Sequence, residues 1–150
     1  MLIRECAYAM RAVMPANMVR VAHVRDHRMV VISSTSKHWP CLFPQHGLGR
    51  KHERRIRLES WQEGIVEHHP EALIRGLIHS DGCRVINRVK GGRYEYPRYM
   101  FSNRSADIHR IFVEACDQLG IEWRRMNPYT TSISRAGSVA AMDTFVGPKA

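Results

Sequence analysis

The sequence predicts an α+β fold with antiparallel hairpins. Its 150 residues are 44% hydrophobic and 25% charged, which is typical of a globular domain and excludes a disordered chain. Helix-spaced apolar residues alternate with pairs of short strand-like segments, and from Pro70 the order is helix, strand, strand, helix, strand, strand, helix. The N-terminal part adds helix, strand, strand. We therefore expect a complete αββαββα unit over residues 70–150, preceded by a partial αββ half.

The N-terminal half begins with an amphipathic helix over Leu2–Met14, which a proline ends. Two strands joined by a turn follow it, namely Val19–Val24 and Arg28–Ser34 with Asp26-His27 between them. Residues 39–46 contain two prolines and predict an irregular turn or a short broken helix. Together these elements define an expected first domain over residues 1–47.

A basic segment over residues 48–69 is expected to link the two halves. It starts as a loop and ends in a helix from Ser60 to His68, where Glu63 stands three residues after Ser60, as in a capping box. The clearest helix of the chain follows over Pro70–Asp81. Proline fits its first position, apolar residues recur at helical spacing, and an Asp-Gly pair ends it.

Two strands with period-two alternation come next, joined by a Gly-Gly turn. The first, Cys83–Lys90, places Arg84, Arg88 and Lys90 on one face. The second, Tyr94–Asn103, directs Tyr99 and Phe101 to one side, and Tyr96, Arg98 and Ser102 to the other. We expect the basic residues of the first strand to share an outward face with the polar residues of the second.

The C-terminal part completes the pattern with a helix, a hairpin and a last helix. Their expected ranges are Ala106–Leu119, Ile121–Met126 with Thr130–Arg135, and Ser138–Phe145. The helix that contains Ile108 is similar in sequence to the one that contains Ile3, which indicates a weak internal repeat.

The chain is strongly basic, with 23 Lys and Arg against 14 Asp and Glu and a net charge of +9. Such a domain typically binds phosphates, with nucleic acid as the first candidate and anionic lipid as the second. A basic domain without such a partner is the alternative. The longest apolar run, Met29–Ile32, is too short to cross a bilayer, so we expect no membrane partner. Four widely spaced cysteines without a Cys-x-x-Cys pair predict free thiols in the cytoplasm.

Residues 76–82 follow the order Gly, apolar, apolar, any residue, small, Asp, Gly. This motif resembles the signature of the LAGLIDADG homing endonucleases, whose unit also has the order αββαββα. Segments 37–47 and 75–83, and residues 96–99 with 102–103, are similar to small LAGLIDADG-type proteins of actinobacteria. The resemblance implies a LAGLIDADG-type fold that binds double-stranded DNA, as in intron homing, on the nucleoid within the cytoplasm. Two-motif members carry a motif helix ahead of the first αββ half, so we expect this helix to be missing here.

The spacing of Gly76 and Ser80 puts two small side chains on one helix face, where a second helix can approach closely. We therefore expect a homodimer through this face. Asp81 at the helix end would then meet a second carboxylate, and the two would hold Mg²⁺ against a DNA phosphate. One carboxylate binds Mg²⁺ poorly, so cleavage requires a partner Asp. The alternative for Asp81 is an ordinary helix-ending turn.

The resemblance also implies basic residues near the metal, and Lys37 and Arg135 stand just past the last strand of each half. Ordinary surface charges are the alternative for both. His79 occupies a variable position of the motif, and we expect a half-exposed histidine without a role. The spacing of His38, Cys41, His46 and His52 matches no zinc-ligand pattern.

Two groups of residues are candidates for contacts with DNA. Arg, Tyr and Ser side chains on a two-stranded ribbon can read base edges in the major groove, and a basic linker can bind phosphates. The hairpin candidates are Arg84, Arg88, Lys90, Arg93, Tyr96, Arg98 and Ser102, and the linker candidates are Arg50, Lys51, Arg54 and Arg55. A solvated sheet face and a plain soluble linker are the alternatives.

The sequence thus leaves three functions open. The first is a LAGLIDADG-type DNA-binding protein that cleaves phosphodiester bonds with Mg²⁺ through Asp81, if dimerisation supplies a second acidic motif. The second is a non-cleaving DNA-binding regulator or a degenerate, truncated endonuclease, which the single motif favours. The third is an RNA-binding, maturase-like splicing factor.

Overall fold

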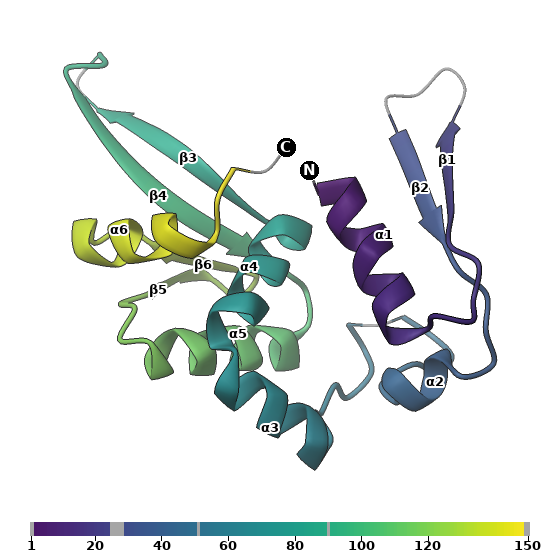
Figure 1. Cartoon of the computed structure of the whole chain (residues 1–150). Coiled ribbons are helices and arrows are strands. Elements are labelled where there is room, and N and C mark those ends of the chain that lie inside the picture. The colour runs from purple at the N-terminus through teal and green to yellow at the C-terminus, as the bar shows by residue number, and fades with distance from the viewer. Residues whose placement is uncertain (1, 25–28, 51, 90, 149–150) are drawn as a thin grey trace. The chain divides into compact units, whose positions relative to one another are not determined.

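The computed structural model describes residues 2–24, 29–50, 52–89 and 91–148. The chain divides into two units between His46 and Gly47 (Figure 1). Both units combine helices with antiparallel strands, so the α+β class predicted from the sequence is confirmed.

The first unit consists of helix α1 (Leu2–Val13), strands β1 (Arg20–Val24) and β2 (Met29–Ser33), and the short helix α2 (Trp39–Leu42). The two strands pair antiparallel, and α1 packs against β2. The indole Nε1 of Trp39 donates a hydrogen bond to the Ser34 carbonyl at 3.0 Å, which ties α2 to the end of β2. The turn expected at Asp26-His27 lies outside the described residues.

The second unit contains four helices and four strands in its described part. In chain order they are α3 (Ser60–His68), α4 (Pro70–Asp81), β3 (Gly82–Val89), β4 (Tyr94–Ser102), α5 (Ala106–Gln118), β5 (Arg124–Asn127), β6 (Thr130–Ile133) and α6 (Ala136–Phe145). From α4 onward this is the order αββαββα. Across the described ranges, no helix is both long enough and apolar enough to cross a membrane.

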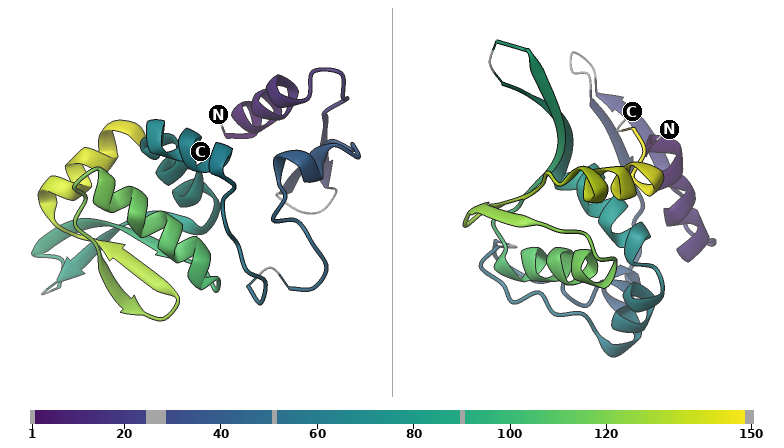
Figure 2. Two further views of the ribbon diagram at one scale, coloured as in Figure 1. Left: turned by 90° about the horizontal axis from the view of Figure 1, so that it is seen from below. Right: turned by 90° about the vertical axis from the view of Figure 1, so that its left-hand side faces the viewer.

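The four strands of this unit form one antiparallel sheet in the order β3-β4-β6-β5. Helices α4, α5 and α6 lie on one side of the sheet (Figure 2, left). Their apolar side chains meet those of the sheet in one core, where Phe101 and Phe112 stack with ring centroids 4.4 Å apart. Gly91 and Gly92 turn the β3–β4 hairpin with φ angles of 68° and 92°, which glycine adopts at no steric cost.

The segment expected as a linker is packed into the second unit. The Ile56 amide donates to Asp107 Oδ2 at 2.7 Å, and the Gln118 side chain donates to the Glu67 carbonyl at 2.7 Å. Helix α3 is capped one residue earlier than predicted, because Glu59 is the N-cap residue and Gln62 closes the capping box. Ile56 and Glu67 are therefore held against α5.

Candidate functional site

One side of the sheet in the second unit is not covered by any described helix of that unit, and we call it the open face. Tyr99 and Phe101 point into the core, at 1% and 0% exposure, so the alternate residues of β4 point the other way. Directly paired residues of antiparallel strands share a face, which extends the assignment to the other strands. The open face consists of Cys83, Val85, Asn87, Val89, Tyr94, Tyr96, Arg98, Met100, Ser102, Arg124, Thr130 and Ser132.

The basic residues of the β3–β4 hairpin were predicted to share one face of the sheet. The register instead divides them between its two faces. Arg84 is paired with the buried Tyr99, and Arg88 is paired with Glu95, so both arginines lie on the helix side of the sheet. The prediction that they share a face with Tyr96 was therefore wrong. Tyr96, Arg98 and Ser102 do lie together on the open face, Arg93 follows the Gly-Gly turn, and Lys90 lies outside the described residues.

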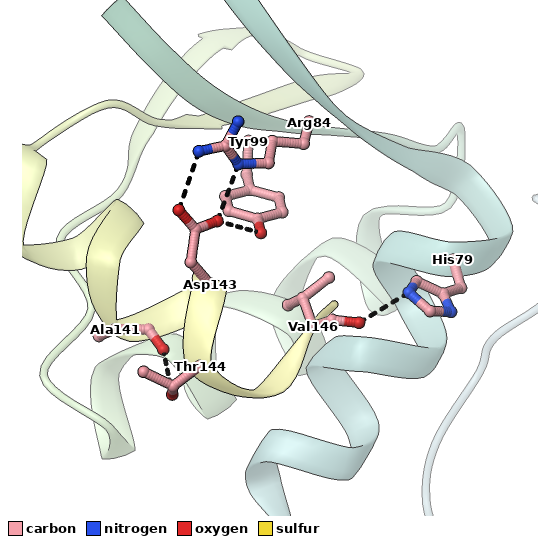
Figure 3. A network of polar contacts seen from close by, with 7 residues as sticks. All are labelled: His79, Arg84, Tyr99, Ala141, Asp143, Thr144 and Val146. Carbon is pink, nitrogen blue, oxygen red and sulfur yellow. Dashed lines mark hydrogen bonds and ion pairs between the residues drawn. The ribbon is translucent and has the colours of Figure 1, made fainter. Parts of the chain in front are cut away.

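The arginines on the helix side are neutralised by carboxylates. Arg84 Nε and Nη2 donate to the two carboxylate oxygens of Asp143 at 2.8 and 2.9 Å, and the Tyr99 hydroxyl donates to Asp143 Oδ1 at 2.6 Å (Figure 3). Arg88 Nε donates to Glu95 Oε1 at 2.8 Å. Bidentate and charge-assisted pairs of this kind fix both side chains and remove net charge from the surface.

The Arg84 cluster shifts the pKa values of its members. The hydrogen bonds from Arg84 hold the pKa of Asp143 below its usual range, and the hydrogen bond to Asp143 raises the pKa of Arg84. Burial, helped by the hydrogen bond to Asp143, raises the pKa of Tyr99 to about 12. No local sequence pattern signals this cluster, because Asp143 lies 59 residues from Arg84.

The two arginines of the open face have no carboxylate partner among the described residues. Arg98 is half-buried, and its Nε has no hydrogen-bond acceptor in the described part of the chain. Arg124 lies on β5 and is exposed, and it is paired with Ser132 of β6. Arg124 was not predicted from the sequence. A signal exists, because Trp123 packs against the core and strand alternation then directs the next residue to the opposite side of the sheet.

Asp81 is the last residue of α4, and it borders the open face. Its exposed side chain lies in a pocket of about 320 Å³ whose lining includes Ser102 of the open face. The other lining residues are His52, Asn103, Arg104 and Tyr129. Asn103 Nδ2 donates to Asp81 Oδ2 at 2.8 Å, so the carboxylate is held at the end of β4.

Asn103 is itself fixed by three further contacts. Its amide donates to the Tyr129 carbonyl at 3.0 Å, and its Oδ1 accepts from the Ser105 amide at 2.9 Å. Its carbonyl accepts from Nε2 of the buried His109 at 2.9 Å. Sequence reasoning missed Asn103, since its contact with Asp81 spans 22 residues and no local pattern signals it.

The surroundings of Asp81 in a single chain do not fit Mg²⁺, which prefers several oxygen ligands in octahedral geometry. Asp81 is the one carboxylate lining its pocket among the described residues. Within the described ranges, no three His, Cys, Asp or Glu side chains gather as metal ligands. We therefore assign no metal-dependent step to one chain alone.

The small-residue face of α4 is uncovered. Gly76 and Ser80 are exposed, and a Cβ added at Gly76 would meet no atom within 4 Å. Ser80 Oγ donates to the Leu77 carbonyl within the helix at 3.0 Å. His79 differs from its prediction: only 8% of it is exposed, and its Nε2 donates to the Val146 carbonyl at 2.9 Å (Figure 3).

The remaining candidates occupy separate positions. Lys37 is exposed in the first unit, and Arg135 precedes α6, where it pairs with Glu122 at 3.2 Å and does not line the Asp81 pocket. Among the basic residues of the segment before α3, Arg50 pairs with Glu53 at 3.5 Å. Arg54 donates to the Gly47 carbonyl, Arg55 lines a groove against α5, and Lys51 lies outside the described residues.

A scan against models of protein families gives no match to this sequence, and a search of curated proteins gives none either.

Proposed function

We propose that the chain binds double-stranded DNA through the open face of the β3-β4-β6-β5 sheet, as a LAGLIDADG-type protein would. The observation that carries this proposal is the contrast between the two sides of the sheet. Arg84 and Arg88 on the helix side are neutralised, whereas Arg98 and Arg124 on the open face have no carboxylate partner among the described residues. The Arg98 Nε is buried as well as unpaired, so the groups proposed to bind a phosphate or guanine are the other N–H groups of Arg98 and the exposed guanidinium of Arg124.

The rest of the open face supports the same partner. Glu95 is the one acidic residue in the four strands, and it lies on the helix side. Hydroxyl and amide side chains accompany the two arginines, and the β3–β4 hairpin extends away from the helices (Figure 1). A two-stranded ribbon fits the B-DNA major groove, which is about 12 Å wide. The net charge of +9 adds long-range attraction to phosphates.

The test is the salt dependence of DNA binding by Arg98→Ala and Arg124→Ala. With a fluorescent duplex of mixed sequence, we expect each variant to bind more weakly. Removing one arginine that binds a phosphate should reduce the slope of log K against log salt by about 0.9. Arg110→Ala is the matched control, since Arg110 lies on α5, on the other side of the sheet. A wild-type slope in both open-face variants would contradict the proposal.

A second function concerns Asp81. Its exposed carboxylate borders the open face, and the neighbouring Gly76 face is uncovered. We propose that a second copy packs on this face, which would bring the partner's Asp81 close enough to complete a Mg²⁺ site. Cleavage of DNA is thus proposed for a dimer, and a monomer is proposed to bind DNA without cutting it.

Two measurements separate these states. Sizing in solution reports whether the chain dimerises, and supercoiled plasmid with Mg²⁺ reports nicking or cutting. Activity that disappears in Asp81→Asn would support the dimeric nuclease, whereas equal residual activity in both proteins would contradict it. Tight duplex binding without cleavage indicates a regulator, and stronger competition by structured RNA than by duplex DNA indicates the maturase-like role.

A further inference from the structure

Two tyrosine rings stack against each other on the open face, next to the turn of the β3–β4 hairpin. Tyr94 and Tyr96 are 43% and 51% exposed, their ring centroids are 6.4 Å apart, and their planes differ by only 20°. The guanidinium carbon of Arg93 lies 5.9 Å from the centroid of the Tyr94 ring. No core packing explains this arrangement, because the hairpin extends away from the helices at this end (Figure 1).

Exposed aromatic rings next to arginine bind nucleic-acid bases by stacking and by cation–π contacts. Every base has a π face, so this kind of binding tolerates any sequence. In an intact duplex the faces of internal bases are covered by their neighbours, and only base edges reach the grooves. The two rings can therefore stack more fully on a base that has left the duplex than on a base inside it.

The surroundings of the rings match a nucleic acid in charge and in hydrogen bonding. Arg93 precedes Tyr94, and Arg98 follows Tyr96 on the same face. Asn87 stands directly opposite Tyr96 and carries an amide that can pair with a base edge. No acidic side chain from the four strands lies on this face, so the strands place no negative charge beside the rings.

We propose that Tyr94 and Tyr96 form a stacking platform for unpaired bases, so that the chain binds DNA with an unpaired base more tightly than intact duplex. The proposal rests on DNA binding by the open face, and it specifies which DNA that face prefers. The hairpin contacts the backbone through its arginines, and the extruded base lies on the exposed tyrosine rings.

The experiment compares three labelled DNAs of equal length: an intact duplex, the same duplex with one bulged 2-aminopurine, and the single strand. Wild-type protein should bind the bulged duplex about 5- to 150-fold more tightly than the intact one, the range that stacking on aromatic side chains supports. The 2-aminopurine fluorescence should fall on binding, because stacking quenches it.

Two variants assign the preference to the rings. Tyr94→Phe/Tyr96→Phe keeps both rings and should keep the preference, whereas Tyr94→Leu/Tyr96→Leu keeps apolar bulk without a π face and should lose it. Tyr8→Leu, at an exposed tyrosine of the first unit, controls for loss of a tyrosine. Circular dichroism checks that each variant folds.

The outcomes separate the two proposals. Duplex binding without any preference for the bulge, or a preference that survives in the leucine variant, would overturn the platform and leave DNA binding intact. Absence of binding to all three DNAs would overturn both.

Discussion

The side-chain amide of Asn103 joins the end of helix α4 to the start of helix α5. Its Nδ2 donates to Asp81 Oδ2 at 2.8 Å, and its Oδ1 accepts from the Ser105 amide at 2.9 Å. Ser105 is the N-cap residue of α5, with its hydroxyl accepting from the Ile108 amide. The side-chain amide of Asn103 thus fixes two things: the Asp81 carboxylate, which is proposed to act on DNA, and the start of helix α5, which packs against the sheet.

Replacing this amide by an apolar group of similar size should destabilise the fold. Asn103→Leu leaves the part-buried Ser105 amide without its acceptor, so we expect the free energy of unfolding to fall by about 1–3 kcal/mol. Urea unfolding measures it. Asn127→Leu is the control, since the exposed Asn127 side chain accepts one bond from the Tyr129 amide and its loss should cost less. Equal losses of unfolding free energy in the two variants would contradict this structural role of Asn103.

The bounds of a helix are predicted best from the sequence where both a start signal and a stop signal are present. Helix α4 runs from Pro70 to Asp81 as predicted, because a proline begins it and an Asp-Gly pair ends it. The cap of α3 was displaced by one residue, since Glu59 and Ser60 both offer a side-chain oxygen to the first turn and only the fold chooses between them.

The face assignment of the hairpin depended on contacts that the sequence does not contain. Alternation groups Arg84 with Arg88, but it does not say which group of the next strand shares their side. That choice is made by the register, which pairs Arg84 with Tyr99, and by Asp143, which arrives from the last helix. The buried position of His79 likewise depends on Val146, 67 residues away.

The Arg84–Asp143 pair should make stability depend on pH at the acidic end. The pKa of Asp143 is lowered in the folded state, so its contribution is present above the unfolded pKa of about 3.9 and is lost as pH falls through the folded value. We expect Asp143→Asn to lower the urea midpoint at pH 7, with the difference from wild type shrinking as pH falls below the unfolded pKa of about 3.9. A difference that stays constant with pH would contradict this assignment.

Tyr99 should titrate later than an ordinary tyrosine. Its pKa is raised to about 12 in the folded protein, so its contribution is fully present below the unfolded pKa of about 10 and is lost as pH rises through 12. Ultraviolet titration of tyrosinate absorbance should show a late phase that Tyr99→Phe removes. Loss of that phase in Tyr96→Phe instead would refute the assignment.

The reactivity of Cys83 with a thiol reagent measures how accessible the open face is, and the buried Cys116 serves as the internal control. Cys83 is exposed there, whereas Cys116 is buried in the core with its pKa raised to about 12 by burial. At pH 8 we expect a thiol reagent to label Cys83 quickly and Cys116 only after unfolding. Saturating duplex DNA should slow the labelling of Cys83, as mass spectrometry of the peptides can measure. Unchanged labelling of Cys83 in the DNA complex would place the DNA elsewhere.

Two glycines of the motif should respond to alanine in opposite directions. At Gly82 an added Cβ would lie 2.8 Å from Ile78 Cα and 2.9 Å from the Met100 carbonyl oxygen, so α4 and β4 approach too closely for a side chain. Gly82→Ala should therefore cost about 1–3 kcal/mol of stability. At Gly76 the same Cβ meets nothing, and alanine in an exposed helix should raise stability by about 0.5–1 kcal/mol.

Chemical unfolding at a protein concentration where the chain is monomeric compares the two directly. Because Gly82 has extended backbone angles that any residue adopts, its cost comes from the steric contact alone. The opposite signs would show that the motif keeps Gly82 for its own packing. Gly76, which the monomer does not need, would then be available for a second helix, and Gly76→Ala should weaken any dimer that sizing detects. A dimer that tolerates this substitution would exclude the Gly76 face as its interface.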